Sequence, residues 1–199
     1  MYNCIFSSHC FEYQQCDRSC PTLAQTSYLL ERNGIQLSSP VFKLPPESLN
    51  KYVSILARSA GKITTYISGS EGTNLAADSL TYCAICENWK GSQLHCTVYN
   101  LKFSQYIDAI QKSWSYNSEN SESDYMKIWA TTAKVLIVSN IDFVNFKDFQ
   151  CQTLLSLLQS RMGASDLTTI IVSPQISTLV GDGPFFGRLT DMLSKQKVV

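Results

Sequence analysis

The sequence predicts an α/β fold with a mostly parallel sheet and flanking helices, and three observations lead to this prediction. Short apolar and β-branched segments alternate with longer stretches in which apolar residues recur at helical spacing. Two of the apolar segments, 134–139 and 168–173, are continuous, as is typical of strands buried on both faces of a parallel sheet. Glycine, asparagine, serine and proline mark the turns between the segments.

The first predicted helix covers residues 22–32. Pro21 precedes it, and proline suits the first turn of a helix because of its fixed backbone angle. Asn33-Gly34 follows it, and these residue types readily adopt the left-handed backbone that ends helices. Prolines at positions 40, 45 and 46 then predict an extended linker. We therefore expect a cysteine-rich module with this helix at 1–34, a linker at 35–47 and the α/β domain at 48–199.

Helices and strands are expected to alternate within the α/β domain. The first of these helices has the required pattern, because Leu49, Tyr52 and Leu56 would lie on one face. The predicted helices are 48–60, 74–89, 103–114, 125–131, 146–162 and 185–193. The predicted strands are 63–68, 94–99, 134–139, 168–173 and 197–199. The serines, asparagines and acids of residues 115–124 predict an exposed loop.

Composition narrows the classes of function. The 199 residues are 44% hydrophobic and 16% charged, which is the balance of a globular chain. No apolar run approaches the roughly 18 residues of a membrane helix, so we expect no membrane span. Sixteen basic and sixteen acidic residues cancel, which argues against clamping nucleic acid by bulk charge but leaves a local basic groove open. Because the chain begins without a signal-peptide pattern, we expect the cytoplasm.

Half of the eight cysteines lie in the first 20 residues and suggest a metal site. Their spacing is C-x5-C-x5-C-x3-C, and a histidine adjoins the second cysteine. Four thiolates suit a closed tetrahedral zinc site, and a metal would explain how so polar a segment folds without an apolar core. The alternative is a tail with free thiols. The expected zinc ligands are Cys4, Cys10, Cys16 and Cys20, with His9 as a substitute.

The remaining cysteines are expected in the core. Cys83 and Cys86 form a C-x-x-C pair inside a predicted helix, but no second pair follows. Two buried thiols are therefore favoured over a metal site or a redox pair. Cys96 and Cys151 fall in a predicted strand and a predicted helix, and His95 in that strand is expected to be structural.

A glycine-rich turn joins the strand 63–68 to the next helix, and nucleotide-binding proteins place a phosphate loop at such a junction. The segment is Gly69-Ser70-Glu71-Gly72-Thr73-Asn74-Leu75-Ala76. Against the pattern G-x-x-x-x-G-K-[ST], Asn74 replaces the glycine, Leu75 the lysine and Ala76 the hydroxyl residue. The loop therefore has no lysine ammonium for the phosphates and no hydroxyl to bind magnesium, so ATP is not expected to bind. Leucine and alanine suit packing instead.

The strand that would carry a Walker B acid lacks it as well. Strand 134–139 ends in Ser139, and Asn140 follows, where an acidic residue would hold the metal. Asp142 lies three positions beyond Ser139 and is expected to point elsewhere. Two independent losses favour an inactive ATPase over an active one. The alternative is a turn of this kind arising by chance in another α/β protein.

Taken in order, these pieces resemble one family. The cysteine module, the linker, the loop GSEGTNLA, the strands VLIVSNIDF and LTTIIVSP and the terminal FFGRL are similar to DnaC/DnaI-type replicative helicase loaders, especially phage and mobile-element versions from Gram-positive bacteria. The resemblance implies a P-loop NTPase-like (AAA+) domain, preceded by a zinc-binding part that contacts the helicase. We expect this domain to be without the helical lid, because the sequence leaves no residues for one beyond position 199.

The resemblance also assigns positions. Gly69 and Gly72 match phosphate-loop glycines, Ser139 stands in place of the Walker B aspartate, and Pro174 lies near the sensor-one asparagine. Arg188 stands at the position of an arginine finger that acts on a neighbouring subunit's nucleotide, with an ordinary surface arginine as the alternative.

Three functions follow as expectations. The first is a non-catalytic protein that binds a replicative DNA helicase or an active AAA+ subunit to load, block or modulate it. The second is a nucleotide-binding loader in which Asp142 and Glu71 serve the metal. The third is an adaptor for single-stranded DNA. Its stacking candidates are Tyr99, Phe103, Tyr106, Trp114 and Tyr116, and its basic candidates are Lys51, Arg58, Lys62, Lys102 and Lys112. Core packing and ordinary surface are the alternatives for them.

Overall fold

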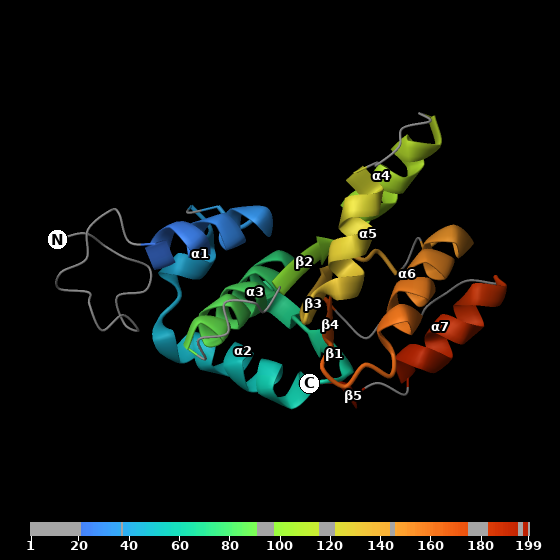
Figure 1. Cartoon of the computed structure of the whole chain (residues 1–199). Helices are drawn as coiled ribbons and strands as arrows, with labels where there is room; N and C mark the ends of the chain where they lie inside the picture. Colours follow the sequence, from blue (N-terminus) through green and yellow to red (C-terminus); the bar gives the residue numbers. More distant parts are fainter. Residues whose placement is uncertain are drawn as a thin grey trace, which may run out of the picture.

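The computed structural model describes residues 21–36, 38–90, 98–115, 122–143, 146–174, 183–194 and 197–198. In this part of the chain a five-stranded sheet has the order β2-β3-β4-β1-β5, and every neighbouring pair is parallel (Figure 1). The strands are β1 Ile63–Ile67, β2 Val98–Lys102, β3 Val135–Ser139, β4 Thr168–Ser173 and β5 Lys197–Val198. The predicted α/β fold is confirmed, and this sheet with its flanking helices is compatible with a P-loop-like arrangement.

Helices cover both faces of the sheet. The α-helices are α1 Pro21–Arg32, α2 Pro46–Ser59, α3 Thr73–Lys90, α4 Phe103–Ser115, α5 Glu122–Thr132, α6 Asp148–Arg161 and α7 Pro184–Ser194. Two short 3-10 turns, η2 Pro40–Lys43 and η3 Gly69–Glu71, lie between them. One buried cluster joins α1, α2 and α3 to the sheet, and a second joins α4, α5, α6 and α7 to it (Figure 1). The fold therefore has three layers.

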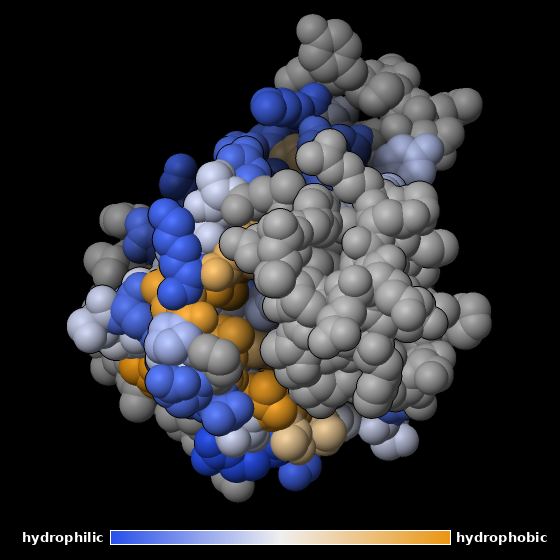
Figure 2. Space-filling model, turned by 90° about the vertical axis from the view of Figure 1, so that its left-hand side faces the viewer, coloured by the Kyte–Doolittle hydropathy of each residue, from blue (hydrophilic) through white to orange (hydrophobic). Residues whose placement is uncertain are grey.

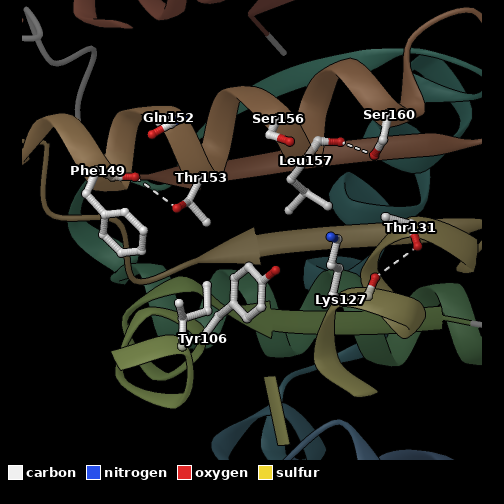
Figure 3. A pocket seen from close by; sticks show the side chains of 10 residues that line it. Tyr106, Lys127, Thr131, Phe149, Gln152, Thr153, Ser156, Leu157 and Ser160 are labelled. Carbon is white, nitrogen blue, oxygen red and sulfur yellow. Dashed lines mark hydrogen bonds between the residues drawn. The ribbon is translucent and has the colours of Figure 1, made fainter. Parts of the chain in front are cut away.

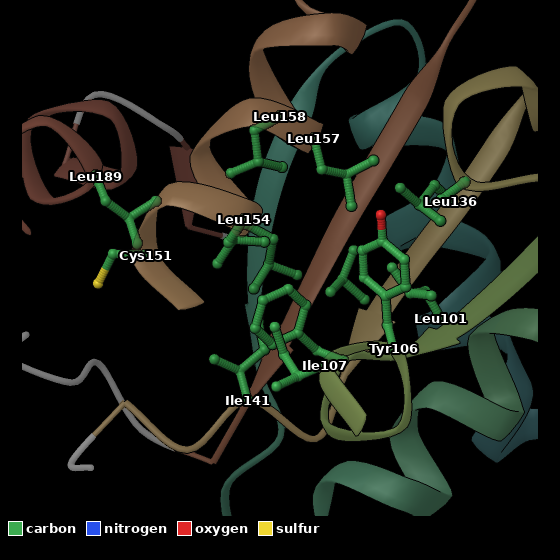
Figure 4. Close-up of a cluster of buried hydrophobic side chains, with 14 of the residues drawn as sticks. Leu101, Tyr106, Ile107, Leu136, Ile141, Cys151, Leu154, Leu157, Leu158 and Leu189 are labelled. Carbon is green, nitrogen blue, oxygen red and sulfur yellow. The ribbon is translucent and has the colours of Figure 1, made fainter. Parts of the chain in front are cut away.

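Alternation along the strands sends side chains into the two clusters. In β3, Leu136 and Val138 belong to the cluster under α4 to α7, whereas Ile137 belongs to the cluster under α1 to α3. Figure 4 shows the cluster under α4 to α7, where leucines of α6 contact Leu136 and Leu101 of the strands. Burying each such side chain contributes about 1.5–3 kcal/mol. The continuous apolar runs of the sequence are explained, because both faces of the sheet are covered.

The segment 35–47 packs more closely than the extended linker that its prolines predict. It contains η2, and Ile35 and Val41 are buried in the same cluster as α3. Ser39 accepts a hydrogen bond from the Val41 amide and donates one to Asp78 of α3. Viewed from the side of α1, apolar surface gathers in a band between hydrophilic residues (Figure 2). The segment is therefore attached to the α/β domain along α3.

Two other boundaries differ from the prediction. The strand expected at 94–99 is found at Val98–Lys102, and residues 94–97 lie outside the described part of the chain. The polar residue Asn100 lies in the middle of this strand, and asparagine is depleted in strands, so the sequence pattern did not extend the prediction to Lys102. Helix α5 begins at Glu122, inside the stretch expected to be a loop. Acidic residues in its first turn favour that start through the helix dipole.

Asn33 caps the edge strand β2. Its side-chain amide donates to the carbonyl of Val98 at 3.3 Å and accepts from the amide of Asn100 at 2.7 Å. A residue of a further parallel strand would make the same pair of bonds on either side of Tyr99. The Asn33 side chain is buried, so these backbone groups are shielded from water and from other chains. Asn33 thus follows the end of α1, as predicted, and also occupies the backbone groups of the edge strand on either side of Tyr99.

Arg161, the last residue of α6, is the largest fully buried side chain of the described residues. Its guanidinium donates to the Thr169 hydroxyl at 2.7 Å and to the Thr168 carbonyl at 2.9 Å, both at the start of β4. It also donates to the carbonyls of Ala130 and Thr131 near the end of α5. Burial lowers the pKa of Arg161 to about 10, so the guanidinium remains charged at neutral pH.

Arg161→Met is expected to lower the free energy of unfolding by about 3 kcal/mol or more, because it leaves three carbonyl groups without their donor. Urea unfolding followed by circular dichroism measures this change. Arg188→Met is the matched control, since Arg188 is exposed on α7 and its loss should change stability by less than about 0.5 kcal/mol. Equal shifts in the two variants would contradict the role given to Arg161.

Candidate functional site at the carboxyl edge of the sheet

The residues matched to a nucleotide site lie along the carboxyl edge of three neighbouring strands. The turn Gly69–Glu71 follows β1, Ser139 ends β3, and Pro174 follows β4. Because the strand order is β3-β4-β1, these positions are adjacent in space. Ser68 ties two of them together, since its backbone amide donates to the Ser173 carbonyl at 2.8 Å. In parallel α/β sheets, ligands bind at this edge.

The glycine-rich turn has the predicted strand-turn-helix context. Gly69 and Gly72 have φ angles of +55° and +83°, which glycine adopts without strain. The short turn η3 begins at Gly69 and is followed by Gly72, and α3 begins at Thr73. Asn74 is exposed, whereas Ala76 is fully buried and Leu75 packs against the cluster under α1 to α3. The residues that replace lysine and serine or threonine therefore serve packing, as predicted.

Glu71, inside this turn, is held by three donors. Its carboxylate accepts hydrogen bonds from the Tyr52 hydroxyl at 2.7 Å and from the Tyr66 hydroxyl, and it forms an ion pair with Lys51. The two tyrosine rings pack edge to face with centroids 6.2 Å apart, and the Lys51 ammonium lies over the Tyr52 ring. Helix α2, strand β1 and the turn are thereby joined through one carboxylate.

The electrostatics of this cluster favour a charged Glu71. Burial raises the pKa of its carboxyl, but the hydrogen bonds from Lys51, Tyr52 and Tyr66 outweigh burial and bring the pKa below its ordinary value. Burial, and then the bond to Glu71, raises the pKa of both tyrosine hydroxyls. At neutral pH the turn therefore contains an anion of its own, and the nearby cation Lys51 is paired with it.

Ser139 is also committed to a structural contact. It is buried at the end of β3, and its hydroxyl donates to the side-chain oxygen of Asn100 on β2 at 3.2 Å. The next residue, Asn140, has a φ angle of +56°, a left-handed conformation that asparagine tolerates. Asp142 is exposed beyond it. Sequence reasoning placed Ser139 at this edge, but it gave no sign of the partner on β2.

Arg188, the candidate arginine finger, is exposed on α7.

The cysteines divide into buried ones and ones outside the described residues. Cys83, Cys86 and Cys151 are buried, which confirms the expectation that they are core thiols. Burial raises the pKa of the Cys151 thiol to about 11. Cys4, Cys10, Cys16 and Cys20, together with His9, His95 and Cys96, lie outside the described residues. Among the residues that the structure does describe, no group of three or more His, Cys, Asp or Glu side chains could hold a metal ion.

The stacking and basic candidates divide between core and surface. Tyr99, Phe103 and Tyr106 are buried, whereas Trp114 is 65% exposed on α4 and Tyr116 lies outside the described residues. Lys51, Arg58, Lys62 and Lys112 are exposed, and Lys102 is half-buried. The three buried aromatic residues are core residues, which was the alternative to a stacking role.

A cavity of about 320 Å³ lies between α4, α5 and α6. Figure 3 shows Tyr106 and Lys127 facing small polar side chains of α6 across it. Burial raises the pKa of the Tyr106 hydroxyl. The hydroxyls of Thr153 and Ser160 donate to carbonyls of their own helix, so these two side chains already have acceptors. Part of the polar lining on the α6 side is therefore engaged within its own helix.

No family model matches this chain, and no curated protein matches it. In the described ranges, no helix has both the length and the apolar character that crossing a membrane requires.

Glu71→Gln is expected to lower the free energy of unfolding by about 1–2 kcal/mol at pH 7, because the amide loses the charge that three donors stabilise. The folded pKa of Glu71 lies below its ordinary value of 4.5, so its contribution is present above that value and is lost as the pH falls through the folded pKa. Urea unfolding of both proteins at pH 7 and pH 3 measures the difference. A gap that stays constant with pH would contradict this account.

Proposed function

We propose that this protein is a non-catalytic relative of P-loop ATPases that acts by binding another protein. The observation that carries the proposal is the state of the phosphate-loop turn. Glu71 places a carboxylate inside it, and Lys51, Tyr52 and Tyr66 hold that carboxylate in place. A nucleotide phosphate would meet this negative charge without the lysine that normally offsets its own.

The packing of the surrounding residues supports the same proposal. Leu75 and Ala76 are turned into the core, and Ser139 is engaged with Asn100. Restoring nucleotide chemistry would require breaking the core contacts of α3 as well as the Glu71 cluster. The fold alone does not require nucleotide chemistry, because one fold can serve many functions.

The partner that the sequence favours is a replicative DNA helicase, or an active AAA+ subunit that acts on one. The basis for this choice is that the motifs of the sequence, in their order along the chain, are similar to those of helicase loaders. The cysteine-rich module, with a zinc ion bound by Cys4, Cys10, Cys16 and Cys20, would form the contact, and the α/β domain would load, block or redirect the helicase without hydrolysis.

The protein is expected to show no magnesium-dependent ATP turnover above background and no saturable binding of a fluorescent ATP analogue. The physical reason is the anionic turn without a lysine or a metal ligand. The control is the double variant Glu71→Gln with Asp142→Asn, which removes the two acids that could serve a metal. Turnover that is present in the unchanged protein and absent from the double variant would establish an unorthodox ATPase instead.

The purified protein is expected to bind the replicative helicase of its own organism in a pull-down with both proteins purified. Cys16→Ser with Cys20→Ser should abolish this binding and release about one zinc per chain, because a four-ligand site does not survive the loss of two thiolates. Ser19→Ala lies between these positions and is the control. Undiminished helicase binding by the double cysteine variant would place the contact elsewhere.

A further inference from the structure

A groove lies beside the edge strand β2. It is open, has a volume of about 750 Å³, and lies between the end of α1 and the exposed side of α5. Tyr99, Asn100 and Lys102 of the edge strand contribute to its lining. Its volume falls in the range of sites that bind ligands, which is roughly 300–1,000 Å³.

Two buried hydrogen-bond donors in the lining find no acceptor among the residues that the structure describes. They are the side-chain nitrogen of Asn100 and the Nε of Arg32. Asn100 is only 6% exposed, and its side-chain oxygen already accepts from Ser139. Leaving a buried donor unsatisfied costs about 1–3 kcal/mol, so two of them in one groove favour a ligand that supplies acceptors.

Aromatic side chains form the wall on the α5 side. Trp129 packs edge to face against Tyr99, and Tyr125 lies beside it with ring centroids 6.4 Å apart. The Arg32 guanidinium is 4.3 Å from the Trp129 ring centroid, which joins the two sides of the groove by a cation–π contact. Tyr125 is still 50% exposed and Trp129 is 36% exposed. Tryptophan, tyrosine and arginine together are the composition of protein-binding hot spots.

The charges of the groove favour a protein segment over a nucleic acid. Arg32 and Lys102 are matched by Glu31 and Glu122, so the lining has no net charge with which to attract a phosphate backbone. The edge of β2 is capped by Asn33, so an incoming segment cannot add a strand at that point and must bind through side chains and isolated carbonyls.

We propose that this groove binds a peptide segment of a partner protein. An aromatic or large aliphatic side chain of the segment packs on Tyr125 and Trp129, and acceptor oxygens of the segment bind the Asn100 amide and the Arg32 Nε. The inference rests on the proposed function and names a surface for it, formed by the end of α1, by β2 and by α5.

A random 12-residue peptide library displayed on phage, selected on the full-length protein, provides the probe. Enriched peptides are expected to carry an aromatic or large aliphatic residue, and their synthetic versions should bind the unchanged protein in a fluorescence anisotropy titration. Tyr125→Ala should weaken binding at least tenfold. Tyr28→Ala is the matched control, because Tyr28 is 62% exposed on α1 outside the groove, and it should change binding less than twofold.

The Asn100 donor is tested in the Ser139→Ala variant, in which the hydrogen bond between Ser139 and the Asn100 oxygen is already absent. Ser139→Ala removes the hydrogen bond to Asn100 but keeps the amide, and it should leave peptide affinity unchanged. Asn100→Leu added to Ser139→Ala removes the donor, and affinity should fall at least fivefold while the thermal midpoint stays close to that of Ser139→Ala. If the added substitution unfolds the protein, the Tyr125→Ala comparison decides.

Several results would overturn the inference. They are a library that yields no enriched peptide, peptides that bind Tyr125→Ala as well as the unchanged protein, or tight binding of single-stranded dT20 that is lost in Tyr125→Ala. Helicase binding that persists despite any of these results leaves the proposed function standing and removes only this groove from it. Conversely, groove-dependent peptide binding without helicase binding would remove the helicase as partner and keep the groove.

Discussion

A buried guanidinium holds together the amino edge of the sheet, and the rest of the structure depends on it. Arg161 joins the end of α5, the end of α6 and the start of β4 through four hydrogen bonds. These elements enclose β3 in sequence, so the contact fixes the crossover that makes β3 and β4 parallel. The carbonyls at the end of α5 carry part of that helix's negative pole, and together with the charge of Asp166 they offset the cost of burying the cation.

The carboxyl edge of the sheet has a different character. There the polar groups are paired within the chain, Glu71 with Lys51 and two tyrosines, and Ser139 with Asn100. A nucleotide-binding edge keeps such groups available for the phosphates and the metal. The difference between the two edges is therefore chemical, since one uses a charge to build the sheet and the other neutralises its charges internally.

Much of this fold could be predicted from local patterns. The continuous apolar strands, the helix ended by Asn33 and the packing roles of Leu75 and Ala76 all follow from residues close together in the sequence. Arg161 was missed although it follows Leu154, Leu157 and Leu158 along the apolar stripe of α6, because a charge on such a stripe is normally taken to mark the surface. The Glu71 cluster could not be predicted, since two of its donors lie 19 and 20 residues earlier, on a separate helix.

The amide of Asn33 has a consequence for selectivity. Main-chain pairing along a sheet edge is available to every sequence, because all residues except proline offer the same N–H and C=O groups. The Val98 carbonyl and the Asn100 amide already bind the Asn33 side chain, so another chain cannot pair with these main-chain groups beside the groove. Whatever binds beside β2 must then be distinguished by the shape and chemistry of its side chains. One asparagine thus does the work of one residue of a sixth strand, and it leaves side chains as the means of recognition at this point of the edge.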